Sequence, residues 1–482
     1  MVLNLQKNLF LRGAFSGEEY MKKIVKPCHM FNYQGRWYVI NIEGMFAKEI
    51  DDKMVGVIKN LTVDPALVLD AHIEEKLTKL GLLSEEVGEC KKDIKEEIPI
   101  SNMALFLTQS CNLKCVYCYG EGGCYGTGGT MKEETAIQAV DWLIEQSGTQ
   151  KDVHIGFFGG EPLLKFSLMK LIVEYGSRRF KETGKKLNFY ITTNGTLLDD
   201  EKIAFLAEHS IEVMVSFDGT KELQDSQRPY INGEGSYDSA VPGIKKLLEI
   251  LPESIGHSVI VGNTDPEIVK DSMEEIGFKH ISIMPASRSL FADETVKTKS
   301  SRDTRSLLQG MEEEAEKWVS LIRKRDSEAL KDFKNRSGLN YALLSLFHNS
   351  KRYHACGAGL GLVAVSFSGD VYLCHRFVGR EEYKLGSVFE KELKREEYQK
   401  SPLSTSKLCS SCFARYYCAG GCKHDNAGSC GSVSKPSEDM CRMRCRELEL
   451  AASIICRLDV EDRIFLIDNE IVPINPCPFD FL

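Results

Sequence analysis

The chain has 482 residues, of which 43% are hydrophobic and 27% charged, and this composition is typical of a globular protein with more than one domain. The formal net charge of −9 argues against a surface that binds nucleic acid through phosphate contacts. No stretch of about 18 apolar residues occurs, so we expect no membrane-spanning segment.

The first predicted element is a hairpin over residues 31–42, with its turn at Gln34-Gly35. Residues 37–42 alternate in the way that suits a half-buried strand. Two helices are expected near residues 51–60 and 67–80, the second ending at a glycine. We interpret residues 1–95 as a winged-helix-like module.

From residue 101 to about residue 300, apolar strand segments alternate with amphipathic helices. This order predicts a parallel sheet, because each right-handed crossover returns the chain in the same direction. Ligands bind such sheets at the C-terminal ends of the strands. The expected strands cover residues 103–108, 153–158, 187–192, 211–217, 257–261 and 280–284.

The remainder of the chain divides into three predicted parts. Residues 301–350 are predicted to form a helical connection, because their pattern is amphipathic. Residues 351–450 contain most of the remaining cysteines, and residues 451–482 are predicted as a C-terminal tail.

Three cysteines follow the first strand of the predicted sheet, at Cys111, Cys115 and Cys118. Three thiolates on one short loop can hold three irons of a 4Fe–4S cluster and leave the fourth iron open to a ligand. A zinc loop is the alternative, although zinc loops usually pair thiols as Cys-x2-Cys. Because no apolar secretory signal opens the sequence, we expect metal ligation in a reducing, cytoplasmic compartment.

This triplet, with Tyr117 just before the third cysteine, resembles the signature of the radical S-adenosylmethionine (radical SAM) enzymes. The resemblance implies a partial (β/α)6 barrel and assigns Cys111, Cys115 and Cys118 to the catalytic cluster. It also implies that the open iron binds S-adenosylmethionine, with Tyr117 beside it. Cleavage of that cofactor yields a 5′-deoxyadenosyl radical, which removes a hydrogen atom from the substrate.

A Gly-Gly-Glu-Pro sequence follows the second predicted strand. Alone, such a tetrapeptide is usually a turn, but glycines also let a backbone approach a ligand, and a glutamate can accept from an ammonium group. By resemblance to the family, Gly159, Gly160 and Glu161 hold the amino group of S-adenosylmethionine.

Polar residues also end the third and fourth predicted strands. Thr193 and Asn194 lie at the end of the third, and Ser216 and Asp218 lie at the end of the fourth; ordinary turns are the alternative. By resemblance, these residues contact the cofactor, and the fourth-strand pair contacts its ribose or the substrate. Arg228 matches a family arginine that can pair with the methionine carboxylate, although a surface salt bridge is as plausible.

Seven cysteines between residues 356 and 441 resemble, position by position, the pattern of the SPASM domain. That domain occurs in radical enzymes that modify peptides and proteins. The resemblance implies two further 4Fe–4S clusters, and hence three in all, although structural zinc is the alternative. One implied ligand set is Cys409, Cys412, Cys418 and Cys441, and the other is Cys356, Cys374 and Cys422.

The second set has only three cysteines, whereas a closed cluster has four ligands. Either Cys445 or Cys430 completes it, or one iron stays open to a substrate thiolate. The N-terminal module resembles the peptide-recognition domain of maturases of ribosomally made peptides, which binds a leader peptide by adding a strand to its sheet. A DNA-binding winged helix is disfavoured by the acidic residues nearby.

The sequence therefore predicts an α/β protein: a radical SAM barrel between a winged-helix-like peptide-recognition module and an Fe–S SPASM domain. It resembles most the maturases that form thioether crosslinks in cysteine-rich precursor peptides (the SCIFF or ranthipeptide type). Carbon–carbon crosslinking and sulfatase maturation through formylglycine are the alternatives, and a non-catalytic Fe–S carrier is disfavoured by the S-adenosylmethionine motifs. The expected partners are a precursor peptide with its leader and a reductant such as flavodoxin or ferredoxin, with neither nucleic acid nor membrane.

Overall fold

The computed structural model describes residues 24–63, 69–84, 98–262, 264–286 and 304–473. The start of the predicted N-terminal module and the end of the predicted tail lie outside these ranges, as do Cys90 and Cys477. Within the described ranges, no helix is both long and apolar enough to cross a membrane.

The N-terminal part is a three-stranded antiparallel sheet with two helices. The predicted hairpin is confirmed, with both turn residues, Gln34 and Gly35, at positive φ. The sheet runs in the order β2-β3-β4, so β2 pairs with β3 alone among the described strands. The elements are β1 (Ile24–Val25), β2 (Cys28–Tyr33), β3 (Arg36–Asn41), β4 (Phe46–Ile50), α1 (Asp52–Val63), α2 (Ala71–Lys79) and β5 (Leu83–Ser84), with β1 paired to β5.

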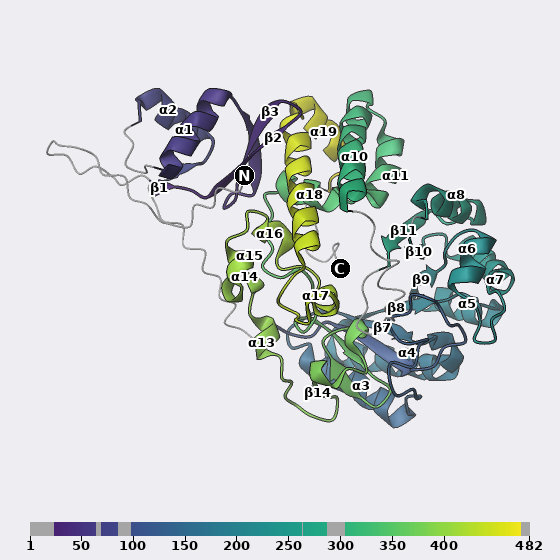
Figure 1. Cartoon of the computed structure of the whole chain (residues 1–482). Coiled ribbons are helices and arrows are strands. Elements are labelled where there is room, and N and C mark those ends of the chain that lie inside the picture. The colour runs from purple at the N-terminus through teal and green to yellow at the C-terminus, as the bar shows by residue number, and fades with distance from the viewer. Residues whose placement is uncertain (1–23, 64–68, 85–97, 263, 287–303, 474–482) are drawn as a thin grey trace.

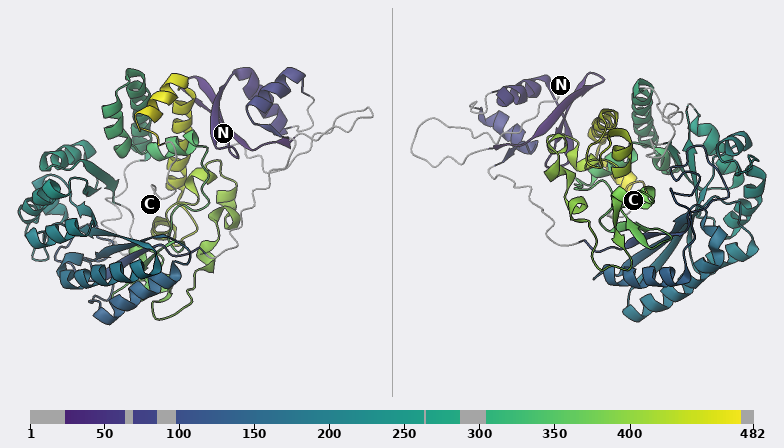
Figure 2. Two further views of the ribbon diagram at one scale, coloured as in Figure 1. Left: turned by 180° about the vertical axis from the view of Figure 1, so that it is seen from behind. Right: turned by 60° about the horizontal axis from the view of Figure 1, so that its bottom comes forward.

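Six parallel strands form the middle of the molecule, and all six predicted strands are confirmed. Figures 1 and 2 show the sheet curving into an open barrel whose helices lie on its outer side. The strands are β6 (Asn102–Thr108), β7 (Asp152–Gly159), β8 (Lys186–Thr193), β9 (Glu212–Ser216), β10 (Ile255–Ile260) and β11 (His280–Pro285). The helices are α3 (Glu133–Gln146), η1 (Pro162–Lys165), α4 (Phe166–Thr183), α5 (Asp200–Glu208), α6 (Lys221–Gln227), α7 (Tyr237–Ile250) and α8 (Pro266–Ile276).

The same sheet continues into the C-terminal cysteine region, which the sequence did not predict. Strand β12 (Leu362–Val365) pairs in parallel with β6, and β13 (Asp370–Tyr372) and β14 (Lys384–Ser387) follow in antiparallel order, giving nine strands. Two 3-10 turns, η2 (His375–Phe377) and η3 (Glu381–Tyr383), lie between β13 and β14. The C-terminal cysteine region is thus joined to the barrel by a shared sheet.

The predicted helical connection consists of three helices. It breaks where Arg325 takes a positive φ and Asp326 caps the next helix. The helices here are α10 (Thr304–Lys324), α11 (Ser327–Arg336) and α12 (Asn340–Phe347). Short helices then carry the cysteine loops, and two longer ones close the chain: α13 (Glu396–Gln399), α14 (Pro402–Thr405), α15 (Lys407–Ser410), α16 (Arg415–Cys418), α17 (Lys423–Cys430), α18 (Glu438–Cys456) and α19 (Val460–Asp468).

The two faces of the N-terminal sheet contribute to two different hydrophobic cores. One face packs on α1 and α2, whereas the other contributes Tyr38 and Ile40 to a core with Trp318, Leu344 and Leu448. In Figure 1, α18 stands between this sheet and α10. The domain boundaries stay a prediction, and one core includes residues from four of the expected parts, namely 1–95, 301–350, 351–450 and 451–482.

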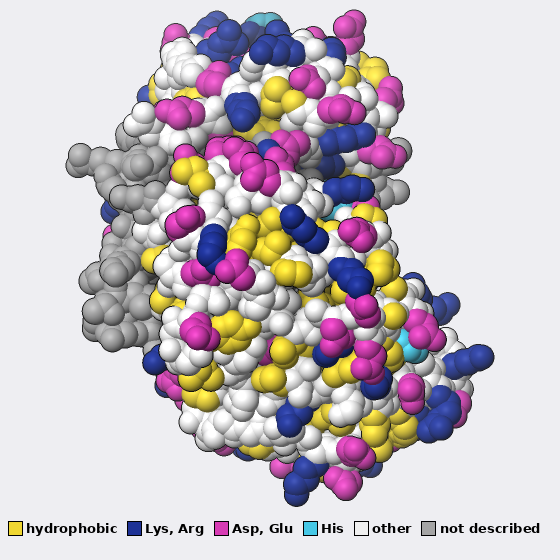
Figure 3. Space-filling view, turned by 90° about the vertical axis from the view of Figure 1, so that its right-hand side faces the viewer, with side chains coloured by type: hydrophobic (Ala, Val, Ile, Leu, Met, Phe, Trp, Pro, Cys, Tyr) yellow, Lys and Arg dark blue, Asp and Glu magenta, His cyan; other side chains and the backbone are white. Residues whose placement is uncertain are grey.

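Acidic and basic side chains are interspersed on the face shown in Figure 3. On this face, the apolar side chains lie between charged ones. Such a mixed surface is typical of a solvated protein face and differs from a continuous basic stripe.

Candidate active site

The loop after β6 brings Cys111, Cys115 and Cys118 to the wall of one cavity of about 2320 Å³. A second segment of chain holds this loop in place: the backbone N–H of Lys114 donates to the Pro229 carbonyl at 2.8 Å, and further bonds flank it. Burial raises the pKa of Cys111 to about 12 and that of Cys115 to about 11. Thiolates at these positions therefore need a bound cation, and three of them around one hollow fit an iron–sulfur cluster.

Gly159 and Gly160 bring β7 against the cysteine loop. A Cβ at Gly159 would lie 2.2 Å from the Thr108 carbonyl oxygen, and one at Gly160 would lie 2.0 Å from that of Ser110. Both glycines line the cavity. A side chain is excluded at these positions because the backbones of Thr108 and Ser110 lie too close.

Glu161 is buried, and its carboxylate accepts three hydrogen bonds, which leaves acceptor capacity for a further donor. It accepts hydrogen bonds from the Leu163 N–H at 3.0 Å, the Thr193 hydroxyl at 2.8 Å and the Asn194 N–H at 2.7 Å. Burial raises its pKa to about 7 despite these bonds. A cationic amino group bound beside Glu161 would favour its charged form. The contact of Glu161 with an amino group stays a prediction.

The end of β8 is bonded directly to the cysteine loop. The Asn194 side-chain amide donates to the Asn112 side-chain oxygen at 2.9 Å and lies 3.8 Å from the Cys111 sulfur. Thr193 and Asn194 line the cavity, as does Ser216 at the end of β9. The predicted residues of β7, β8 and β9 therefore lie around the same hollow as the three cysteines.

Asp218 and Arg228 form a buried ion pair behind the first cysteine loop, and their contacts with the cofactor or substrate stay a prediction. Asp218 is fully buried and accepts from the Tyr117 hydroxyl at 2.6 Å and the Val259 N–H at 3.1 Å. Its carboxylate also pairs with the Arg228 guanidinium at 3.1 Å. Arg228 lines the cavity, with its Nη1 3.9 Å from the Cys115 sulfur. Asp218 thus supports Tyr117 and Arg228 from behind, and Arg228 is a buried ion pair rather than a surface one.

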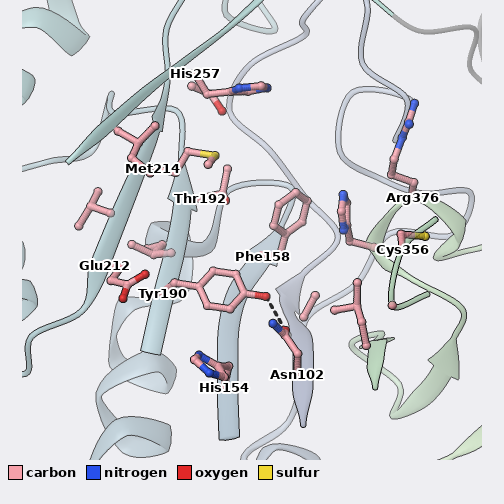
Figure 4. A pocket seen from close by; sticks show the side chains of 18 of the residues that line it. Asn102, His154, Phe158, Tyr190, Thr192, Glu212, Met214, His257, Cys356 and Arg376 are labelled. Carbon is pink, nitrogen blue, oxygen red and sulfur yellow. Dashed lines mark hydrogen bonds between the residues drawn. The ribbon is translucent and has the colours of Figure 1, made fainter. Parts of the chain in front are cut away.

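Cys356, Cys374 and Cys422 lie together in the C-terminal region. Burial, and then the thiols of Cys356 and Cys422, raise the pKa of Cys374 to about 12. Cys356 lines the same cavity as the first cysteine loop. Figure 4 shows Cys356 and Arg376 on the side of the cavity opposite the barrel strands that carry Tyr190 and Met214. The first cysteine loop and Cys356, one member of the second group, therefore line one cavity.

Cys409, Cys412, Cys418 and Cys441 form a separate group. The Cys445 sulfur lies 3.9 Å from that of Cys412. The thiols of Cys412, Cys409 and Cys430 together help to raise the pKa of Cys441 after burial. Cys445 and Cys430, the two candidates for a fourth ligand in the Cys356 group, thus lie beside this group instead. The group of Cys356, Cys374 and Cys422 therefore has three thiols.

The sequence missed several side chains inside the cavity. The Tyr190 hydroxyl on β8 donates to the side-chain oxygen of Asn102 on β6 at 2.8 Å (Figure 4). His375 and Arg376 enter from the C-terminal region. Their position directly after Cys374 was the signal available in the sequence, whereas Tyr190 and Asn102 carry no local motif.

Residues 105–276 match the model of the radical SAM superfamily. The chain therefore carries a radical SAM domain. Proteins of this superfamily use a 4Fe–4S cluster and S-adenosylmethionine, and the buried cysteine loop described above fits that group. The match covers β6 to α8, the part of the barrel that holds the cysteine loop and the polar strand ends.

Two curated relatives extend the comparison. An uncharacterized protein of Methanocaldococcus jannaschii is 30% identical over 186 residues, which are 38% of this chain and 62% of that protein, less than two thirds of its length. A serine-type anaerobic sulfatase-maturating enzyme of Bacteroides thetaiotaomicron is 26% identical over 349 residues, 65% of this chain and 80% of that enzyme.

Two solved structures share the fold. anSMEcpe with bound AdoMet and Cp18Cys peptide has a TM-score of 0.59 at 21% identity, covering 73% of this chain and 97% of that one. Streptococcus suis SuiB bound to precursor peptide SuiA has a TM-score of 0.50 at 16% identity, covering 84% of this chain and 96% of that one. At these identities, the likeness describes the fold.

Proposed function

We propose that this radical SAM enzyme modifies a ribosomally made precursor peptide and joins a peptide cysteine sulfur to a carbon of another residue as a thioether. The observation that carries the proposal is the group Cys356, Cys374 and Cys422, which has three thiols, one of which, Cys356, lines the cavity of the first cysteine loop. Three protein thiols leave a fourth ligand position, which a peptide thiol can fill.

In this proposal, three 4Fe–4S clusters are held by the three cysteine groups. When bound at Cys111, Cys115 and Cys118, the cluster and S-adenosylmethionine supply the 5′-deoxyadenosyl radical that removes a substrate hydrogen atom. Glu161 holds the cofactor's amino group, and Arg228, fixed by Asp218, presents a guanidinium to its carboxylate.

The chain's own residues position the substrate. The cavity wall formed by β7 to β9 faces the wall that carries Cys356, so a peptide between them meets both sites. Joining a substrate carbon radical to a thiolate sulfur forms one C–S bond and releases one electron. The thiol proton passes to solvent before the bond forms, and the electron would pass to the cluster that Cys356, Cys374 and Cys422 would hold.

Formylglycine formation is the second candidate, because sulfatase-maturating relatives align over about two thirds of the chain. The two products separate cleanly in an anaerobic assay with the enzyme, S-adenosylmethionine, a reductant and a cysteine-bearing peptide encoded beside its gene. A thioether removes one H2 and makes the cysteine resistant to alkylation. Formylglycine from cysteine instead releases sulfide and gives an aldehyde that reacts with hydrazines. A carbon–carbon crosslink leaves the cysteine free to be alkylated.

The N-terminal sheet is the proposed site for the leader peptide. A second cavity of about 430 Å³ runs along β2, with Trp37 from β3, Lys59 and Thr62 from α1, and Glu449 from α18. A peptide that adds a strand to β2 would lie against this hollow. Because the other face of the sheet shares a core with α10, α12 and α18, deleting the module would expose that core.

Point substitutions are therefore the sharper test of leader binding. Thr62→Arg fills the cavity beside β2, and Lys59→Glu reverses a charge at its rim. We expect each to weaken binding of a fluorescent full-length precursor by roughly tenfold, while uncoupled S-adenosylmethionine cleavage stays unchanged. Lys53→Glu, an exposed position on the same helix, is the matched control. If Thr62→Arg and Lys59→Glu bound the precursor as tightly as Lys53→Glu and the wild type, the proposed leader site would be wrong.

A further inference from the structure

We propose that Arg376 is a positioning residue for the group held by Cys356, Cys374 and Cys422, and that its guanidinium makes this group a better electron acceptor. The inference rests on the proposed cluster at this site and goes beyond it, since it names the side chain that sets the site's reduction potential. Arg376 lies in the η2 turn directly after β13 and Cys374.

Arg376 contacts both cysteine regions at once. Its Nη1 lies 3.9 Å from the Cys422 sulfur and donates to the Asp425 carboxylate at 2.9 Å. Its guanidinium also lies over the Tyr119 ring, 5.4 Å from the centroid. Tyr119 directly follows Cys118, a cysteine of the first loop. Arg376 therefore bridges the first cysteine loop and the Cys356 group.

The surroundings of Arg376 enhance its electrostatic effect. Its side chain is 18% exposed and that of Asp425 is 26% exposed, so water screens their charges only in part. An N–H donor and a positive charge beside a ligating sulfur stabilise the reduced, more negative state of an iron–sulfur cluster. Arg376 should raise the reduction potential, and the Asp425 carboxylate, which shares the same N–H group, should lower it.

The direction of this effect suits the proposed reaction. Formation of a thioether from a carbon radical and a thiolate releases one electron, and an acceptor of higher potential takes it more readily. The simpler account is that Arg376 and Asp425 are only an ion pair that holds two loops together. That account predicts a loss of stability on substitution but no shift of potential.

The test is a redox titration followed by electron paramagnetic resonance on the full chain. A background with Cys111, Cys115 and Cys118 changed to Ala leaves about eight irons in two clusters and removes the signal of the first site. In this background, Arg376→Gln should lower the potential of one cluster, and Asp425→Asn should raise it. The other cluster should not move. Lys423→Gln removes a positive charge next to Cys422 and is the matched control, expected to shift the potential less than Arg376→Gln.

Opposite shifts from Arg376→Gln and Asp425→Asn would support the inference. Unmoved potentials with the iron retained would overturn it, as would a shift from Lys423→Gln as large as that from Arg376→Gln. If Arg376→Gln loses iron, Arg376→Lys keeps the charge and should give a smaller drop, while Asp425→Asn still has to raise the potential. Zinc or no cluster in the parent protein would instead refute the proposed function.

Discussion

Two cysteine sites of this protein are built from the same parts. Each has three thiols, an Arg–Asp ion pair whose guanidinium nitrogen lies 3.9 Å from a cysteine sulfur, and a tyrosine ring beneath the guanidinium. At the first site, the pair is Arg228 and Asp218; at the second, it is Arg376 and Asp425. The tyrosines of both flank Cys118.

The two pairs differ in their exposure. The side chains of Arg228 and Asp218 are 6% and 0% exposed, whereas those of Arg376 and Asp425 are 18% and 26% exposed. The Asp218 carboxylate also accepts hydrogen bonds from the Tyr117 hydroxyl and the Val259 N–H, so the position of the first pair is fixed by two further contacts. An enclosed pair suits a site that must hold a cofactor in one geometry, and a more open pair suits a site that meets a substrate.

Changing Cys111, Cys115 and Cys118 together to Ala should have the largest effect. We expect the loss of about one third of the iron, by ligand count, and of all S-adenosylmethionine cleavage. The matched change of Cys356, Cys374 and Cys422 should remove a similar share of iron but leave uncoupled cleavage. Iron analysis and detection of 5′-deoxyadenosine decide this, and stoichiometric zinc in the parent would contradict the three-cluster proposal.

Gly160→Ala and Gly379→Ala compare two close backbone contacts: Gly160 lies against Ser110 beside the first cysteine loop, and Gly379, two residues after the η2 turn that carries Arg376, lies against Tyr125. An added Cβ would lie 2.0 Å from the Ser110 carbonyl oxygen in the first case and 1.9 Å from that of Tyr125 in the second. Such overpacking costs about 1–3 kcal/mol of unfolding free energy. We expect Gly160→Ala to reduce cofactor cleavage and Gly379→Ala to reduce peptide modification more than cleavage. Equal loss of both activities in the two variants would mean that the sites are not separable.

Asp218→Asn removes the counter-ion of Arg228 and changes the acceptor of Tyr117. Supporting residues of this kind typically contribute 10- to 100-fold in affinity or activity, and we expect a loss of that size in S-adenosylmethionine cleavage. Asp425→Asn should have a much smaller effect on cleavage, because it supports the other site. Kinetics of 5′-deoxyadenosine formation measure both, and iron content is the control for assembly.

The pH dependence of cofactor binding should give the smallest effect. Burial raises the pKa of Glu161 to about 7, so its carboxylate is protonated below that pH in the unliganded protein. A proton on Glu161 opposes binding of an ammonium group. Affinity for S-adenosylmethionine should therefore fall by up to about tenfold for each pH unit below 7. Calorimetry on the wild type and on Glu161→Gln measures this; the variant should bind weakly without this dependence. A wild-type affinity that stays constant from pH 8 to 6 would show that Glu161 does not bind the amino group.

The sequence by itself determined the barrel strands and the local cysteine spacing. Each predicted strand is an apolar segment whose period and length are local properties, and the structure has all six. The Cys111–Cys118 loop and the Gly-Gly-Glu-Pro turn were readable for the same reason, because their residues are neighbours in the chain. Their placement at strand ends then follows from the parallel sheet.

Tertiary structure alone decided which distant residues meet. Cys445 lies beside Cys412 rather than in the group of Cys356, because α18 packs against α12 and α16. Arg376 reaches Asp425 and Tyr119 only after β12 joins the barrel sheet beside β6. Such contacts depend on packing between segments far apart in the chain, for which local spacing carries no signal.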